Sequence, residues 1–124
     1  MIQGFEEYTA PLTDYERDAL LPRLVHYLSL CNGAANAVKN GTIVRHLRYY
    51  GCKATEARVR KLINHIRIHA LVPCLVASSR GYYVTDDPEE LDKFIASLAG
   101  REDAIRAVRV SMENQRNTIQ PCRR

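Results

Sequence analysis

The stretch from residue 55 to residue 67 separates its apolar and cationic side chains onto different faces of a helix. Thr55 can cap this helix by accepting a backbone N–H, and Glu56 suits the positive end of the helix dipole. Positions three, four and seven apart share a helix face. The apolar face holds Val59, Leu62, Ile63 and Ile66; the remaining surface holds Arg58, Lys61, Asn64 and Arg67, with Arg60 at the edge of the apolar face. Such a helix packs on a core and presents a cationic surface outward.

Two further helices are predicted before this one. The segment Thr13-Asp14-Tyr15-Glu16 fits a capping box, and Leu20, Leu21, Leu24, Val25 and Leu28 follow at helical spacing. Pro22 lacks a backbone donor, so we expect it to kink or split this first helix, which ends near Cys31-Asn32-Gly33. Residues 32–40 are small and polar and are interpreted as a loop. A second helix is predicted over residues 41–50, ending at Gly51 and burying Ile43, Val44 and Leu47.

A β-hairpin is predicted next. The β-prone runs Leu75-Val76-Ala77 and Tyr82-Tyr83-Val84 flank the short polar loop Ser78-Ser79-Arg80-Gly81. Alternation along a strand sends neighbouring side chains to opposite faces, so one of the two tyrosines should face inward. Arg80 is placed at the tip of the hairpin.

A long C-terminal helix is predicted from the Asp86-Asp87-Pro88-Glu89-Glu90 segment onward, because acids and proline favour the first turn of a helix. Two rows repeat every seven residues along it, with polar breaks at Arg101 and Gln115. The apolar members of these rows, which we predict to mediate dimerisation, are Leu91, Phe94, Leu98, Ile105, Val108 and Met112. Packing of the helix on its own domain is the alternative, and parallel and antiparallel dimers both stay open.

The net charge of +4 is unevenly distributed along the chain. Residues 39–80 contain nine basic residues against the single acid Glu56, a net charge of +8, whereas the segments on either side are net negative. A block of one sign within a folded domain attracts an anionic partner. We interpret it as a nucleic-acid surface, with a solvated basic face as the alternative.

Length and composition limit the class of protein. The 124 residues suit one domain, and 46% hydrophobic with 26% charged residues is typical of globular proteins. The longest apolar stretch, residues 70–77, is too short for a membrane span and contains Pro73. The N-terminus is acidic, unlike a signal peptide, so we predict a cytoplasmic protein without membrane partners. We predict that its cysteines are free thiols packed as small apolar residues; they are Cys31, Cys52, Cys74 and Cys122.

Metal binding and catalysis are the weaker alternatives. His65 and His69 have the i, i+4 spacing that can hold zinc, but no glutamate follows His65 to complete the metalloprotease pattern. No Gly-rich phosphate loop, nucleophile elbow or catalytic carboxylate pair is found, and the acids at 86–90 are explained by a helix start. We therefore predict no enzyme activity, no metal site and no cofactor.

The predicted fold is mainly α with a small β-hairpin: a winged helix-turn-helix followed by a long C-terminal helix. Its third helix fits the DNA major groove, where arginine pairs with guanine and asparagine with adenine. The predicted groove residues are Arg58, Lys61, Asn64 and Arg67; the predicted backbone contacts are Arg45, Arg48, Lys53 and Arg60; Arg80 is the predicted contact of the hairpin. The predicted divisions are an arm over 1–12, the domain over 13–85, the helix over 86–117 and a frayed tail over 118–124.

A resemblance supports the same reading. The runs 54–63 (Ala-Thr-Glu-Ala-Arg-Val-Arg-Lys-Leu-Ile), 78–83 (Ser-Ser-Arg-Gly-Tyr-Tyr) and Glu89-Glu90-Leu91 resemble small winged helix-turn-helix proteins of phages, prophages and mobile elements. The resemblance covers roughly residues 12–117 and implies binding of double-stranded DNA, in transcription regulation or DNA replication. The alternative is a winged-helix docking module whose partner is a protein of a replication or helicase-loading complex. A docking module need not keep a cationic third helix, whereas a DNA-binding protein must.

Overall fold

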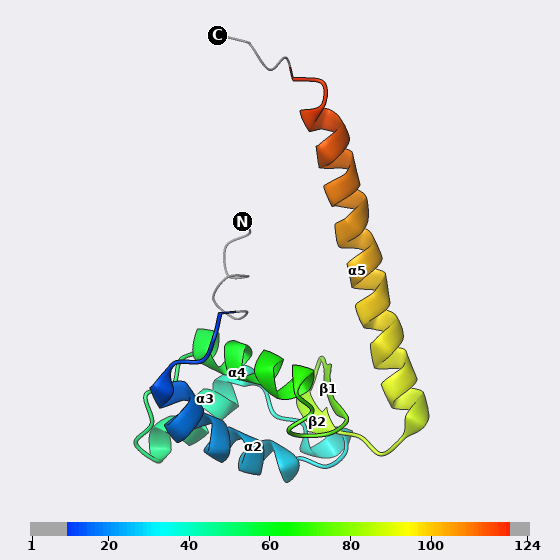
Figure 1. Ribbon diagram of the computed structural model, residues 1–124. Coiled ribbons are helices and arrows are strands. Elements are labelled where there is room, and N and C mark those ends of the chain that lie inside the picture. The colour runs from blue at the N-terminus through cyan, green and yellow to red at the C-terminus, as the bar shows by residue number, and fades with distance from the viewer. Residues whose placement is uncertain (1–9, 120–124) are drawn as a thin grey trace. The chain divides into compact units, whose positions relative to one another are not determined.

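The computed structural model describes residues 10–119 of the chain (Figure 1). Helices account for most of this part, and a single hairpin supplies its two strands. In chain order the elements are the π-helix η1 (Glu16–Leu20), α2 (Leu21–Ser29), the 3-10 helix η2 (Ala34–Asn36), α3 (Asn40–Tyr49), α4 (Glu56–Ile68), β1 (Leu75–Ser78), β2 (Gly81–Val84) and α5 (Pro88–Arg116).

The first helical segment begins with the predicted capping box. The Thr13 N–H donates to Glu16 Oε1 at 2.9 Å, and the Glu16 N–H donates to Thr13 Oγ1 at 3.2 Å. The split expected at Pro22 takes the form of a change in helix type, because η1 is a π-helix and Pro22 lies in the first turn of the following α2. Proline has no N–H to donate, so the chain changes hydrogen-bond pattern immediately before it: the Leu21 N–H reaches back five residues to the Glu16 carbonyl.

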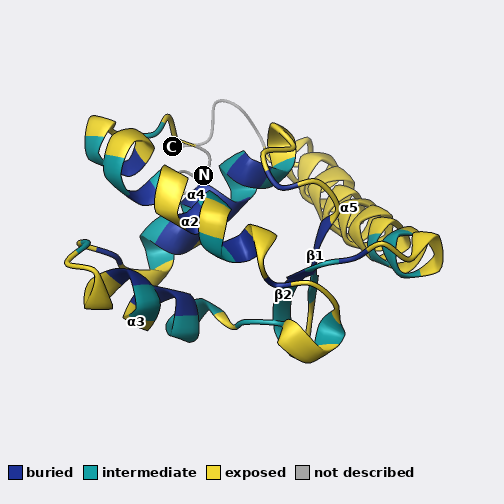
Figure 2. Cartoon of the chain, turned by 90° about the horizontal axis from the view of Figure 1, so that it is seen from below, coloured by how far each residue is buried: buried dark blue, intermediate teal, exposed yellow. Residues whose placement is uncertain are grey.

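The core lies between α2, α3 and α4, which pack together beside the hairpin (Figure 1). Each helix contributes the apolar stripe predicted for it, and Figure 2 shows these buried positions on the inner sides of the helices. Burying each of these side chains contributes about 1.5–3 kcal/mol. The buried stripe residues are Leu20, Leu24, Leu28, Ile43, Val44, Leu47, Val59, Leu62, Ile63 and Ile66.

The hairpin closes one side of this core. Its antiparallel register pairs Leu75 with Val84 and Ser78 with Gly81, which leaves Ser79 and Arg80 as the connecting loop. Tyr82 packs against the core cluster, whereas Tyr83 is buried but lies outside that cluster. The hairpin is therefore confirmed and its two tyrosines lie on opposite faces, as strand alternation predicts, but neither of them is exposed.

The segment before α3, predicted to be a loop, contains more regular structure than its composition indicates. It forms η2, and it also pairs with β2 through isolated bridges on either side of η2. The Val38 N–H donates to the Tyr82 carbonyl at 3.0 Å, and the Tyr82 N–H donates back to the Val38 carbonyl at 2.8 Å. These two bonds satisfy backbone groups that a free loop would leave to water. Residues near 38 thus act as a short third partner of the hairpin.

Helix α5 is 29 residues long and contains no buried residue. The contacts of the chain divide it into two compact units after Pro88, so α5 forms the second unit. Of the predicted dimer residues, Leu91 and Phe94 are half-buried. The other four, Leu98, Ile105, Val108 and Met112, are exposed. The predicted N-terminal arm lies largely outside the described residues, as does most of the predicted tail.

Free thiols are found at three positions in the described part, with Cys31 buried, Cys52 half-buried and Cys74 exposed. The prediction that the cysteines pack as small apolar residues therefore fails for Cys74, which lies in the connection before β1 with a left-handed backbone (φ 61°). Cys122 lies outside the described residues. No helix between residues 10 and 119 is both long and apolar enough to cross a membrane.

Candidate nucleic-acid interface

One flank of α4 carries Arg60, Asn64 and Arg67, spaced by four and three residues and therefore stacked along the helix. We call these three residues the outer row. Arg60 is exposed, and Asn64 and Arg67 are half-buried. The Arg67 guanidinium carbon lies 5.7 Å from the centre of the Tyr82 ring in β2, a cation–π contact. This contact links the outer row to the hairpin.

The other two predicted groove residues, Arg58 and Lys61, lie on a buried carboxylate. Lys61 Nζ is 2.7 Å from Glu16 Oε1, and Arg58 Nε is 3.4 Å from Glu16 Oε2. Glu16 is only 3% exposed, and the Lys61 side chain is only 11% exposed. The sequence placed Lys61 on the outward cationic surface of the helix, whereas the structure places it in a nearly buried ion pair. The spacing along α4 could not reveal this, because its partner lies 45 positions earlier in the chain.

Arg58 is held by three groups at once. Besides its ion pair with Glu16, its Nη1 donates to the Lys53 carbonyl at 2.8 Å, and its guanidinium carbon lies 5.5 Å from the centre of the Tyr15 ring. The Tyr15 hydroxyl in turn accepts the Lys53 N–H at 2.7 Å. Arg58 therefore ties the start of α4 to the first helical segment and to the loop before α4. Sequence reasoning missed the roles of Tyr15 and Glu16, apart from the capping box.

The charge state of Glu16 follows from its burial and from its contacts with Lys61 and Thr13. Burial raises the pKa of Glu16, but the hydrogen bond from Lys61, the Thr13 N–H and the charge of Lys61 outweigh it and leave the pKa below its ordinary value. Glu16 is therefore ionised at neutral pH. Its negative charge neutralises part of the positive charge of Arg58 and Lys61.

The predicted backbone-contacting residues of the preceding helix and loop are exposed. Arg48 Nε donates to the Ala54 carbonyl at 2.9 Å, which fixes that guanidinium beside the loop between α3 and α4. Arg45 Nη2 donates to Thr42 Oγ1 on its own helix at 3.2 Å. Lys53 is exposed in the same loop. Arg48, Lys53 and Arg58 are thus gathered around residues 53 and 54.

Arg80 is exposed in the two-residue turn of the hairpin, as predicted. Its own N–H donates to Ser78 Oγ at 3.1 Å, which stabilises the turn without engaging the guanidinium. Tyr82, in the second residue pair from this turn, contacts Arg67 of α4. The hairpin therefore carries a cation in its turn and contacts α4 close to that turn.

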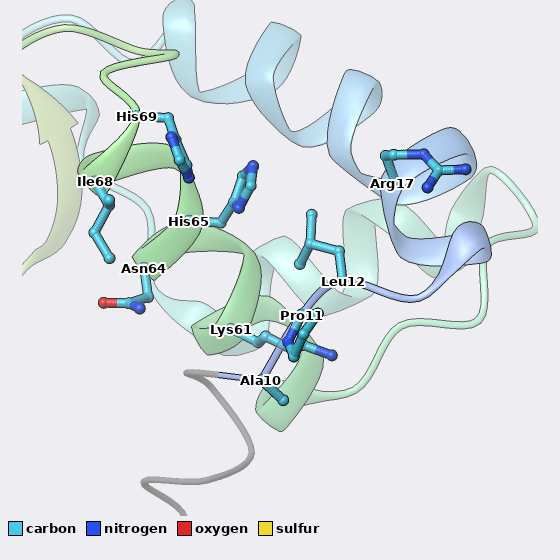
Figure 3. Close-up of a pocket in the computed structure, with 9 residues that line it drawn as sticks. All are labelled: Ala10, Pro11, Leu12, Arg17, Lys61, Asn64, His65, Ile68 and His69. Atoms are coloured by element: carbon cyan, nitrogen blue, oxygen red, sulfur yellow. The ribbon is translucent and has the colours of Figure 1, made fainter.

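A hollow of about 470 Å³ lies on the Lys61 side of α4, between that helix and residues 10–17 (Figure 3). His65 and His69 line it with ring centroids 4.4 Å apart. Burial lowers the pKa of His65, and the neighbouring His69 lowers it further. The pair offers two imidazole ligands, and no group of three or more His, Cys, Asp or Glu residues suited to a metal occurs among residues 10–119.

The remaining predicted DNA-contacting cations thus lie in three places: the outer row of α4, α3 with the loop around residues 53 and 54, and the turn of the hairpin with Arg80. Arg58 and Lys61 bind the buried Glu16 carboxylate instead. Besides Lys61 and the two histidines, the hollow is lined by Ala10, Pro11, Leu12 and Ile68, by Arg17, and by Asn64 of the outer row. No protein-family model, curated protein or solved structure matches this chain.

Proposed function

We propose that the protein binds double-stranded DNA, with the outer row of α4 in the major groove. Arginine and asparagine have the hydrogen-bonding groups that read guanine and adenine edges in that groove. The single observation that carries this proposal is the contact of Arg67 with Tyr82, because it joins a helix face of base-reading side chains to a hairpin with a cation at its tip. Three helices followed by such a hairpin have the order of a winged helix-turn-helix, which is the fold we propose.

The exposed cations of α3, of the loop before α4 and of the hairpin turn supply the phosphate contacts in this arrangement. Arg48 and Lys53 lie at the loop before α4, and Arg80 lies at the hairpin tip, where it would reach the adjacent backbone or minor groove. Arg45 lies one helical turn before Arg48 and extends the same set. Phosphate contacts position a protein on the duplex, and the outer row then reads base edges.

Arg58 and Lys61 have a positioning role in this proposal. Both bind the Glu16 carboxylate, and Arg58 also binds the loop that carries Lys53. Because the Glu16 carboxylate neutralises the Lys61 ammonium, the ion pair as a whole attracts a phosphate only weakly. The proposed groove residues are therefore Arg60, Asn64 and Arg67, without Arg58 and Lys61.

A docking module for another protein is the second candidate. The observation that favours it is α5, whose 29 residues include no buried side chain and several exposed large apolar ones. An exposed apolar stripe of this kind marks an interaction surface. The two candidates differ in their demand on α4, because only DNA binding needs its cations. The role in transcription regulation or DNA replication implied by the resemblance is part of the first candidate.

A salt titration tests the proposal. Fluorescence anisotropy with a random-sequence duplex is expected to give micromolar binding near physiological salt. If the four cations proposed to contact phosphates do so, the slope of log K against log salt is about −3.6, and affinity falls about 150-fold between 50 and 200 mM salt. Absence of binding at 50 mM salt would remove the DNA proposal and leave the docking candidate.

A further inference from the structure

Helix α5 exposes a row of large apolar side chains along most of its length. Leu98 is 43% exposed, Ile105 is 65% exposed and Met112 is 55% exposed, and Val108 lies among them with similar exposure. These positions belong to two rows that each repeat every seven residues. A seven-residue apolar repeat is the pattern of a coiled-coil seam, which is buried only against another helix.

We infer that α5 of a second copy of this chain covers this row, in an antiparallel coiled coil centred on Asp103. Asp103 lies one residue from the middle of α5, so this register overlaps the two helices over nearly their full length. The first row contains Leu91, Leu98, Ile105 and Met112, and the second contains Phe94, Arg101, Val108 and Gln115. The layers of the seam then place a residue of the first row in one copy against a residue of the second row in the other copy. They pair Phe94 with Met112, Leu98 with Val108, and Arg101 with Ile105. This pairing is independent of DNA binding.

Arg101 decides the direction of the two helices. In a parallel dimer, equivalent residues share a layer, so two Arg101 guanidinium groups would meet inside the seam. In the antiparallel register, each Arg101 lies opposite Ile105 of the other copy, and the two guanidinium groups occupy different layers. The aliphatic stem of arginine can cover an isoleucine while its charged end reaches water.

The charges that flank the seam agree with this direction. Glu102 and Arg109 lie seven residues apart, in one row along the edge of the seam. In an antiparallel dimer, this row of one copy lies against the same row of the other copy. Glu102 of each copy then faces Arg109 of the other, which gives two charge pairs on one side of the seam. Arg109 already holds Glu113 of its own helix at 2.9 Å, and its five N–H donors leave capacity for a second carboxylate. In a parallel dimer the row opposite these residues holds Ser97, Ala104 and Ser111, so no charge pair forms.

Distances between spin labels on the full-length chain test the direction. Cys52, Cys74 and Cys122 are replaced by serine, while Cys31 stays because it is buried and burial raises the pKa of its thiol. A label is then placed singly at Lys93→Cys, Ala104→Cys or Asn114→Cys, all exposed positions of α5. The antiparallel register predicts a short distance at 104, within about 20 Å, because coiled helices lie only 8–10 Å apart. It predicts at least about 30 Å at both 93 and 114, because 20 or more residues of helix rise separate each site from its copy.

Short distances at all three sites would show a parallel dimer, and the absence of any dipolar signal would show a monomer; either result overturns the inference. The variant Ile105→Asp, in the Ala104→Cys background, is expected to abolish the short distance. No side chain of α5 is buried, so this variant leaves the fold of the first unit intact. A short distance that survives Ile105→Asp would place the contact outside the proposed seam and would also overturn the inference.

Discussion

Replacing Glu16 with alanine is expected to destabilise the protein by about 3–5 kcal/mol, the usual cost of removing one partner from a buried ion pair. Glu16 is 3% exposed and accepts from Lys61 at 2.7 Å, so its loss leaves a nearly buried ammonium group without its carboxylate. The same substitution removes the capping box with Thr13. Chemical denaturation followed by circular dichroism measures the change.

Two control variants separate this effect from a general loss of charge. Asp18→Ala removes a carboxylate two residues away whose ion pair with Arg17 is exposed, and it is expected to cost no more than about 0.5 kcal/mol. The double variant Glu16→Met with Lys61→Met is expected to recover more than half of the loss, because it buries neither charge. Equal stability of Glu16→Ala and Asp18→Ala would contradict the account of the ion pair.

Acid should remove the same contribution in the wild-type protein. The folded pKa of Glu16 lies below its unfolded value, so its stabilisation is complete above the unfolded pKa, about 4.3, and disappears as the pH falls through the folded pKa. Glu16→Ala lacks this component. The stability difference between wild type and variant is therefore expected to shrink below about pH 4.

Gly81→Ala is the second variant with a large expected effect, about 3–5 kcal/mol of lost stability. Gly81 has φ +122°, and a Cβ there would lie 2.2 Å from the Val38 carbonyl oxygen, which is backbone and cannot swing away. Relief of this clash requires breaking the paired hydrogen bonds between Val38 and Tyr82. Because Tyr82 contacts Arg67, the variant should also weaken DNA binding. Thermal and chemical denaturation measure the first effect.

Gly51→Ala is the matched control for this substitution. Gly51 also has a positive φ, +79°, but no atom lies within 4 Å of the site where its Cβ would be. It is therefore expected to cost only the left-handed backbone penalty, about 1–2 kcal/mol. If the two glycine variants were equally stable, the close approach of Val38 to the hairpin would not contribute to the fold.

The helices and the hairpin were predictable from the sequence because local patterns encode them. The stripe of α4 from Val59 to Ile66 needs only the helical period, and the Thr55 cap, which accepts the Arg58 N–H at 3.1 Å, needs only its position before that stripe. The bridge between Val38 and Tyr82 was not predictable in this way. This bridge is formed by backbone N–H and carbonyl groups, and the side chains of the polar segment give no pattern that predicts it.

In the candidate site, too, contacts between segments far apart in the chain could not be predicted from the sequence. The spacing of α4 indicated which residues avoid the core, but not which of them another segment covers. Lys61 and Arg60 are adjacent in sequence; the segment beginning near Glu16 covers Lys61, and Arg60 stays exposed. The sequence placed Lys61 outside the apolar face and Arg60 at its edge, so it did not reveal which of the two is exposed. A long-range ion pair of this kind depends on tertiary packing.

The central claim is that the outer row of α4 contacts DNA, and a matched pair of charge reversals tests it most directly. Arg60→Glu and Arg106→Glu change the net charge equally, and both residues are exposed, one on α4 and one on α5. Anisotropy with the random duplex at about 0.1 M salt is expected to show at least about tenfold weaker binding for Arg60→Glu and a salt slope about one unit shallower. Arg106→Glu is expected to stay within about twofold of wild type, because Arg106 belongs to the second unit and is not part of the proposed DNA surface. Equal losses in the two variants, or none in Arg60→Glu, would contradict the claim.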